Sequence, residues 1–115
     1  MRILQLLSQI QPTGAEAYAI AVANWLSEQG HEVFFASDKL HSQIKQPFFP
    51  LAVHSNSLLT RIKSTLRLRR LLKDKSIQVI HCHSRAAARL AYWATFGSKI
   101  AVISTLHGRQ PLSLS

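Results

Sequence analysis

Three short polar segments, each directly after an apolar run, contain the residues best suited to chemistry. In the first segment, 11–16, Gly14 stands where a helix is expected to begin after a strand. Backbone N–H groups at a helix start are unpaired and lie at the positive end of the helix dipole, so they favour anions. We therefore interpret Thr13, Gly14 and Glu16 as a loop that contacts an anion or a diphosphate. The alternative is an ordinary tight turn in which Glu16 complements the dipole.

The second segment, 81–85, reads His-Cys-His-Ser-Arg at the end of an expected strand. Alternate residues of a strand face opposite sides, so His81 and His83 share a face and Cys82 opposes them. His83, Ser84 and Arg85 could hydrogen-bond a polar substrate, whereas His81 is better interpreted as a histidine packed inside the sheet layer. For His83 the packed and functional interpretations both stay open. One cysteine with two nearby histidines is weak support for a zinc site, which would need more ligands at suitable spacing.

The third segment contains His107, Gly108 and Arg109 after the last apolar run. Because an imidazole has an ordinary pKa near 6.5, His107 can donate or accept a hydrogen bond at neutral pH. Its partner could be a ligand hydroxyl or the backbone of its own loop.

Several common catalytic patterns are missing from the sequence. The first loop has a single glycine, so it matches neither GxGxxG nor the phosphate loop GxxxxGK followed by Ser or Thr. An NAD or ATP site is therefore disfavoured. The GxSxG motif of serine hydrolases is absent, and only 5 acidic residues are available for a mechanism with two carboxylates.

Net charge is +9, from 14 Lys and Arg against 5 Asp and Glu. Much of it lies on one expected helix, which could be a solvated face, could rest on anionic lipid head groups, or could bind nucleic acid. Nucleic acid is disfavoured because no aromatic residue interrupts the sequence between Phe49 and Tyr92. The candidate membrane-facing cations are Arg61, Lys63, Arg67, Arg69, Arg70 and Lys73.

The bulk composition fits one folded domain. At 115 residues the chain is 47% apolar, so it can form a core, and its single cysteine rules out an internal disulfide. The N-terminus lacks the apolar length and cleavage site of a signal peptide, and no uncharged apolar stretch reaches the roughly 18 residues of a membrane span. We therefore expect a cytoplasmic protein.

Apolar runs and helical periodicity alternate along the chain. Expected strands are 2–8, 31–37, 51–54, 77–82 and 99–106, and expected helices are 15–29, 55–75 and 84–96. This alternation predicts an α/β, Rossmann-like parallel sheet of about five strands in the order 3-2-1-4-5, with helices on both faces. Such a sheet brings the three polar segments into one crevice at the carboxyl ends of its strands.

The helices are expected to bury one apolar face each. In helix 15–29 that face contains Tyr18, Val22 and Leu26, with Ala19 and Ala23 beside them. Ser55 or Ser57 is a possible N-cap of helix 55–75, and Gly30 a natural C-cap of the preceding helix. The expected apolar face of helix 55–75 is formed by Leu58, Leu59, Ile62, Leu66, Leu68 and Leu72.

Four segments, in the expected order, resemble the N-terminal half of GT-B fold glycosyltransferases of family 4. Segment 13–16 (Thr-Gly-Ala-Glu) resembles the family's Gly-Gly-Ala-Glu loop, with threonine in place of the first glycine. Segment 30–33 (Gly-His-Glu-Val) matches in full. Segment 79–84 resembles Val-Val-His-x-His-Ser, and segment 103–108 resembles Val-x-Thr-x-His-Gly.

The resemblance implies that residues 1–115 are the single Rossmann-like, acceptor-side domain of a larger two-domain enzyme. Such an enzyme transfers a hexose from a nucleotide-sugar to an acceptor, with retention, and needs no metal or other cofactor. Gly14 would then lie near the donor diphosphate and His107 near the donor sugar, as the catalytic residue. His83, Ser84 and Arg85 would border the acceptor pocket, and Gly108 and Arg109 would belong to the cleft loop.

Because the second domain is missing from this chain, the resemblance predicts no transfer activity for it alone. Many family members act on lipid-linked or cell-envelope acceptors, such as those of lipopolysaccharide, at the inner face of the plasma membrane. A different interpretation is a non-enzymatic basic module that docks on an anionic membrane or nucleic acid. A third, a flavodoxin-type domain, fits poorly because loop 9–14 is not rich in Ser, Thr and Asn.

Overall fold

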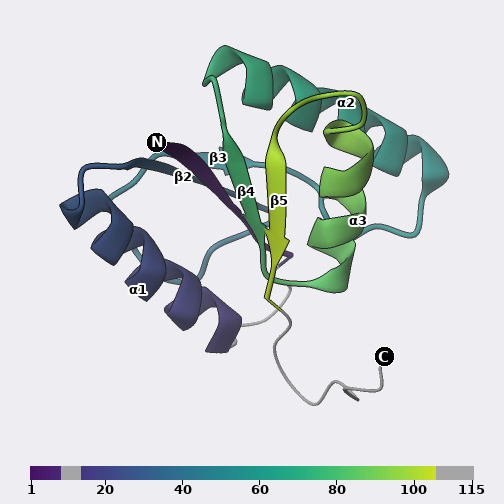
Figure 1. The fold of residues 1–115 in the computed structure, drawn as a ribbon. Helices are drawn as coiled ribbons and strands as arrows, with labels where there is room; N and C mark the ends of the chain where they lie inside the picture. The colour runs from purple at the N-terminus through teal and green to yellow at the C-terminus, as the bar shows by residue number, and fades with distance from the viewer. Residues whose placement is uncertain (9–13, 106–115) are drawn as a thin grey trace, which may run out of the picture.

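A computed structural model describes residues 1–8 and 14–105, in which parallel strands lie between two layers of helices (Figure 1). The strands are β1 (Arg2–Leu6), β2 (Glu32–Ser37), β3 (Phe48–Pro50), β4 (Val79–Cys82) and β5 (Ala101–Ser104). The helices are α1 (Gly14–Glu28), α2 (Leu58–Asp74) and α3 (Arg85–Ala94).

The sheet has the order β3-β2-β1-β4-β5 and every neighbouring pair is parallel. In the central register Gln5 of β1 lies between Phe35 of β2 and His81 of β4. The α/β class and the strand order predicted from the sequence are therefore confirmed. As predicted, helices cover both faces, with α1 on one side and α2 and α3 on the other.

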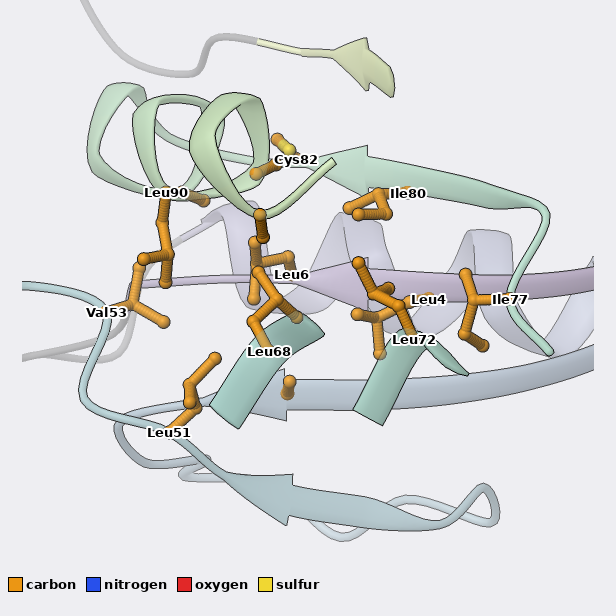
Figure 2. Packing of buried hydrophobic residues seen from close by; sticks show 14 of the residues in the cluster. Leu4, Leu6, Leu51, Val53, Leu68, Leu72, Ile77, Ile80, Cys82 and Leu90 are labelled. Atoms are coloured by element: carbon orange, nitrogen blue, oxygen red, sulfur yellow. The ribbon is translucent and has the colours of Figure 1, made fainter. Parts of the chain in front are cut away.

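The core is divided by the sheet into two clusters. Leu4 and Leu6 point from β1 into the larger cluster, where they pack with Leu68 of α2 and Leu90 of α3 (Figure 2). Leu7 lies in the smaller cluster under α1. Each fully buried leucine contributes about 1.5–3 kcal/mol to folding, so Leu4 and Leu6 in β1 and Leu7 directly after it hold helices on both faces of the sheet.

The third strand was predicted at 51–54 but forms at Phe48–Pro50. Pro50 is tolerated because β3 is an edge strand, where a missing N–H breaks no ladder on the outer side. Leu51 and Val53 are buried as predicted, but the backbone beyond Leu51 is not held by a neighbouring strand. Instead the Asp38 carboxylate accepts hydrogen bonds from the backbone N–H groups of residues 53 and 54.

The buried face of α1 differs from the prediction. Tyr18 is 45% exposed and Val22 is half-buried, whereas Ala19 and Ala23 are fully buried. The small alanines let the helix backbone lie close to β2, so the face that packs is the alanine face.

The outer part of α2 also contradicts the predicted apolar face. Its buried residues are Ser64, Leu68 and Leu72, and the Ser64 hydroxyl donates to the Ala52 carbonyl oxygen at 2.6 Å. Only one side of a helix can rest on the sheet, and the remaining apolar residues point outward. The exposed residues are Leu58, Leu59, Ile62 and Leu66.

The helix ends follow the predicted capping chemistry. Ser57, one of the two candidates, caps α2 by accepting a hydrogen bond from the Thr60 N–H at 3.3 Å. Gly30, after α1, has a φ of 93°, the left-handed region that favours glycine. No helix in residues 1–8 and 14–105 combines the length and the apolar character that crossing a membrane requires.

Candidate functional site at the carboxyl edge of the sheet

A cluster of aromatic and polar side chains lies where β4 ends against α1. His81 and His83 lie on the same side of β4, with ring centroids 4.1 Å apart, as predicted from their spacing. The Tyr18 ring of α1 contacts both, with centroids 6.3 Å from His81 and 5.9 Å from His83. In Figure 1 the arrowheads of β4 and β5 point toward the end of the sheet at which α1 and α3 begin.

Each imidazole has a side-chain partner on a neighbouring segment. His81 Nε2 lies 2.8 Å from the Thr105 hydroxyl oxygen, just after β5, and His83 Nε2 lies 2.5 Å from Gln5 Oε1. Because an amide oxygen only accepts, this contact corresponds to the His83 tautomer with a proton on Nε2. His83 is 3% exposed whereas His81 is half-buried, so the interior position predicted for His81 belongs to His83.

Ser84 and Arg85 directly follow His83 and form the start of α3. The Ser84 hydroxyl caps α3 by accepting from the Ala87 N–H at 3.1 Å, and it retains a proton that it can donate. Arg85 is exposed as the first residue of the helix. A hydroxyl and a guanidinium at one helix start are suited to a ligand with hydroxyl or anionic groups.

The start of α1 combines an open backbone with a buried carboxylate. A methyl group added at Gly14 would meet no atom within 4 Å among the described residues. Glu16 is 3% exposed, and each of its carboxylate oxygens lies 3.1 Å from the backbone nitrogen of His41, which donates to them. Glu16 therefore ties the first turn of α1 to the connection after β2, besides complementing the helix dipole.

Cys82 faces away from the histidines into the larger core cluster, as the alternation predicted. Burial raises the pKa of its thiol from 9.0 to about 12, because the apolar surroundings disfavour the thiolate. Among the residues that the structure describes, no three His, Cys, Asp or Glu side chains form a group that could hold a metal ion.

Not all predicted site residues can be placed. Thr13, His107, Gly108 and Arg109 lie outside the described residues. The cations of α2 lie on the opposite face of the sheet from the histidine cluster, so the structure does not bring them to this site. All of them are exposed except the half-buried Arg61; they are Lys63, Arg67, Arg69, Arg70 and Lys73.

Three members of the cluster were missed by the sequence reasoning. Tyr18 was assigned to the core, and Thr105 was only part of a strand pattern. Gln5 gave a usable signal, because it is a polar residue inside the run Ile-Leu-Gln-Leu-Leu of a buried strand. A buried amide needs a partner, and the parallel neighbour of β1 supplies it from His83.

The sheet order, the two helix layers and the polar edge define a Rossmann-like half of a GT-B fold. Residues 12–114 match the sequence profile of Glycosyltransferase Family 4. The chain belongs to this family. A search of curated proteins found no match.

Three solved structures show the same fold at low sequence identity. A glycosyltransferase from Rickettsia africae ESF-5 has a TM-score of 0.83 and 23% identity, over 97% of this chain and 31% of its own. MurG from Acinetobacter baumannii has a TM-score of 0.68 and 16% identity, over 92% and 35%. The lipopolysaccharide outer core galactosyltransferase WaaB, in its apo form, has a TM-score of 0.73 and 18% identity, over 92% and 33%. The chain thus spans about a third of the length of each.

Proposed function

We propose that residues 1–115 form the acceptor-side domain of a retaining glycosyltransferase that moves a hexose from a nucleotide-sugar to a sugar or lipid-linked acceptor. The observation that carries this proposal is the family match over residues 12–114. The cluster at the carboxyl edge supports it, because ligands of open α/β sheets bind at that edge, where the strand order reverses.

In the proposed reaction, the bond between the anomeric carbon and the donor diphosphate breaks. A bond from that carbon to an acceptor oxygen forms, and the acceptor proton and the nucleoside diphosphate leave. The start of α1 would stabilise the developing diphosphate charge through its backbone N–H groups, and the open space at Gly14 supports a close approach. Thr13 and Glu16 would shape this loop.

The acceptor would lie against His83, Ser84 and Arg85. His83 is held by Gln5, so its role is to fix the wall of the pocket, while the Ser84 hydroxyl and the Arg85 guanidinium contact the ligand. His107 would act at the donor sugar, flanked by Gly108 and Arg109. We propose that neither a metal nor another cofactor takes part.

The partner of this domain would be a second, nucleotide-binding domain that closes over the cleft. Closure excludes water and completes the charge stabilisation, which one half cannot do alone. We therefore expect the 115-residue chain by itself to have no measurable transfer activity, and turnover by the isolated chain would contradict this part of the proposal.

A second candidate function is docking on an anionic membrane through α2, and a specific observation favours it. Four apolar residues of α2 remain exposed beside its cations, as in helices that lie in a membrane interface. The two functions are compatible, since a transferase that uses lipid-linked or cell-envelope acceptors would work as a peripheral protein at the cytoplasmic face of the membrane. Nucleic acid remains the disfavoured partner.

The donor contact can be tested by titrating the isotope-labelled chain with UDP and following backbone amide signals by NMR. We expect shifts at residues 14–16, and we expect Gly14→Ala to weaken binding about tenfold or more, because its methyl group fills the approach to the helix start. Stability should stay the same or rise by about 0.4–1 kcal/mol, since this position suits alanine.

The matched control is Ala17→Ser, at an exposed position of the same helix, which should bind UDP as the parent chain does. Because other nucleotides are possible donors, the same titration is repeated with GDP and ADP. If none of the three shifts residues 14–16, or if Gly14→Ala binds as tightly as Ala17→Ser, the proposed diphosphate contact is wrong.

A further inference from the structure

A groove of about 560 Å³ separates the first half of α2 from α3, on the sheet face opposite to the histidine cluster. Its walls are apolar: Leu58, Ile62 and Leu66 come from α2, and Leu90 and Trp93 from α3. Val53, in the connection after β3, closes the floor, where it and Leu90 point toward each other (Figure 2). Both the volume and the mostly apolar lining are those of small-molecule sites.

The groove is held open by hydrogen bonds at its floor. The Asp38 carboxylate accepts from the Val53 N–H at 3.2 Å and from the His54 N–H at 3.3 Å. One turn further on, the Ser64 hydroxyl donates to the Ala52 carbonyl oxygen at 2.6 Å. These bonds hold residues 52–54 both to the end of β2 and to α2. The shape of the groove is therefore set by hydrogen bonds within the protein.

The charged residues that line the groove are both arginines, while the Asp38 carboxylate lies behind its floor and is bonded to backbone N–H groups. Arg61 and Arg89 line it, and none of its lining residues is acidic. The Arg61 Nε is buried and has no hydrogen-bond partner among residues 1–8 and 14–105. Arg61 as a whole is half-buried and lines the groove, so an anion there would contact its terminal N–H groups rather than the enclosed Nε.

We propose that this groove binds one phosphate-bearing amphiphile taken from a lipid surface. Its apolar chain would lie along the α2 and α3 walls, and its phosphate would contact Arg61 and Arg89, which can each bind phosphate through two N–H groups. Polar residues also line the groove (His54, Ser55, Asn56 and Thr65), but the apolar walls beside two arginines match an apolar chain that carries a phosphate. The site is independent of the proposed transfer reaction and stands or falls without it.

Trp93 provides a direct readout, because the chain has only 2 tryptophans and the other, Trp25, lies on α1. In a Trp25→Phe background, Trp93 is 57% exposed and should emit as a solvated indole. Dodecyl phosphate, added below its critical micelle concentration, should shift this emission to the blue and saturate at one equivalent. Dodecyl trimethylammonium, with the same chain and opposite charge, and inorganic phosphate should each produce no saturable shift.

Arg61→Gln and Arg89→Gln should each weaken dodecyl phosphate binding about tenfold or more, the loss typical of one charge-assisted contact. Arg70→Gln, an exposed cation of α2 outside the groove, is the matched control and should bind as the parent does. Circular dichroism checks that the variants keep their helices, which changes at the half-buried Arg61 and the exposed Arg89 should not disturb.

Three results would overturn the proposal: equal shifts with the cationic amphiphile, equal losses in Arg70→Gln and the groove variants, or no saturable shift. A fourth is a Trp93 emission that moves to the blue with protein concentration alone, together with a dimer in size-exclusion chromatography. In that case a second copy of the chain fills the groove.

Discussion

At the scale of single residues, the side chains at the end of β4 alternate between a polar cluster on one face of the sheet and the apolar core on the other. His81 and His83 enter a hydrogen-bonded cluster with Gln5 and Thr105, while Cys82 between them is enclosed in apolar contacts. The histidines hydrogen-bond to polar partners, whereas burial raises the pKa of the thiol and so keeps it neutral. A nucleophilic role for the only cysteine is therefore disfavoured by its surroundings.

The Cys82 thiol should make folding sensitive to alkaline pH. Its pKa is about 12 in the folded protein against 9.0 as the ordinary value, so the unfolded chain loses the proton first. The free energy of unfolding should then fall as pH rises above 9, by at most about 1.4 kcal/mol per pH unit from this group. Urea unfolding between pH 7 and pH 10.5 measures this dependence.

Cys82→Ala is the comparison, because lysines and tyrosines titrate alike in both proteins and cancel in the difference. The variant should be less stable at pH 7, since it loses packed volume, yet its stability should decline less steeply with pH. Parallel curves for the two proteins would contradict the buried thiol as the cause.

At the scale of elements, α1 and α2 pack against the sheet with side chains of different size. α1 uses Ala19 and Ala23 to bring its backbone close to the sheet, and α2 uses Leu68 and Leu72 to fill a wider space. The helix with small residues thus leaves room for Tyr18 beside the histidines. The helix with large residues leaves the leucines of its first half, Leu58, Leu59 and Leu66, exposed to solvent.

Ala23→Leu tests the close contact of α1 with the sheet. Ala23 has no exposed surface, so three added carbons must displace β2 or the helix, and overpacking of this kind costs about 1–3 kcal/mol. Ala21→Leu, at an exposed position of the same helix, should change stability by no more than about 0.5 kcal/mol. Thermal and urea unfolding compare the two, and similar stability for both variants would mean that α1 is not closely packed.

The sequence predicts the elements better than the faces they bury. Alternation of apolar runs with helical periods is a local signal, and it correctly predicted the strand order and the caps at Ser57 and Gly30. The burial of Tyr18, Leu59 and Leu66 depends on which side of a helix meets the sheet. Which side of a helix meets the sheet is decided by long-range packing, and the periodicity of apolar residues within the helix gives no information on it.

For the candidate site, too, the local geometry could be predicted from the sequence, whereas the long-range contacts could not. The shared face of His81 and His83 follows from strand geometry, so spacing was enough. The pairing of Gln5 with His83 joins residues that are 78 positions apart, and it became visible only with the register of β1 against β4. The position of a residue along its strand therefore predicted that it lies at the carboxyl edge of the sheet. It did not predict which side chain it hydrogen-bonds there.

At the scale of the whole molecule, charge and apolar surface coincide on α2. Binding to vesicles that contain anionic lipid should be strong at low salt and weaken as salt rises, because the cations act through a screened field. Neutralising Arg67, Arg69 and Arg70 to Gln should weaken it about a hundredfold, at roughly 1 kcal/mol for each cation.

A matched triple variant tests whether position matters or only net charge. Lys39→Gln, Lys45→Gln and Lys99→Gln remove the same charge away from α2, and this protein should sediment with the vesicles nearly as the parent does. If both triple variants lose binding equally, the attraction comes from the overall charge and α2 is not the contact.

The outer edge of β5 affects whether copies of this chain associate in solution. Among residues 1–8 and 14–105, β5 is the outermost strand on that side and its outer backbone groups pair with no strand, and Val102 and Ile103 are 38% and 53% exposed. Such a flank can recruit a strand from another molecule. Mutual repulsion at a net charge of +9 opposes that encounter. Colloidal behaviour should therefore depend on ionic strength, with concentrated salt shortening the lifetime of a clear solution.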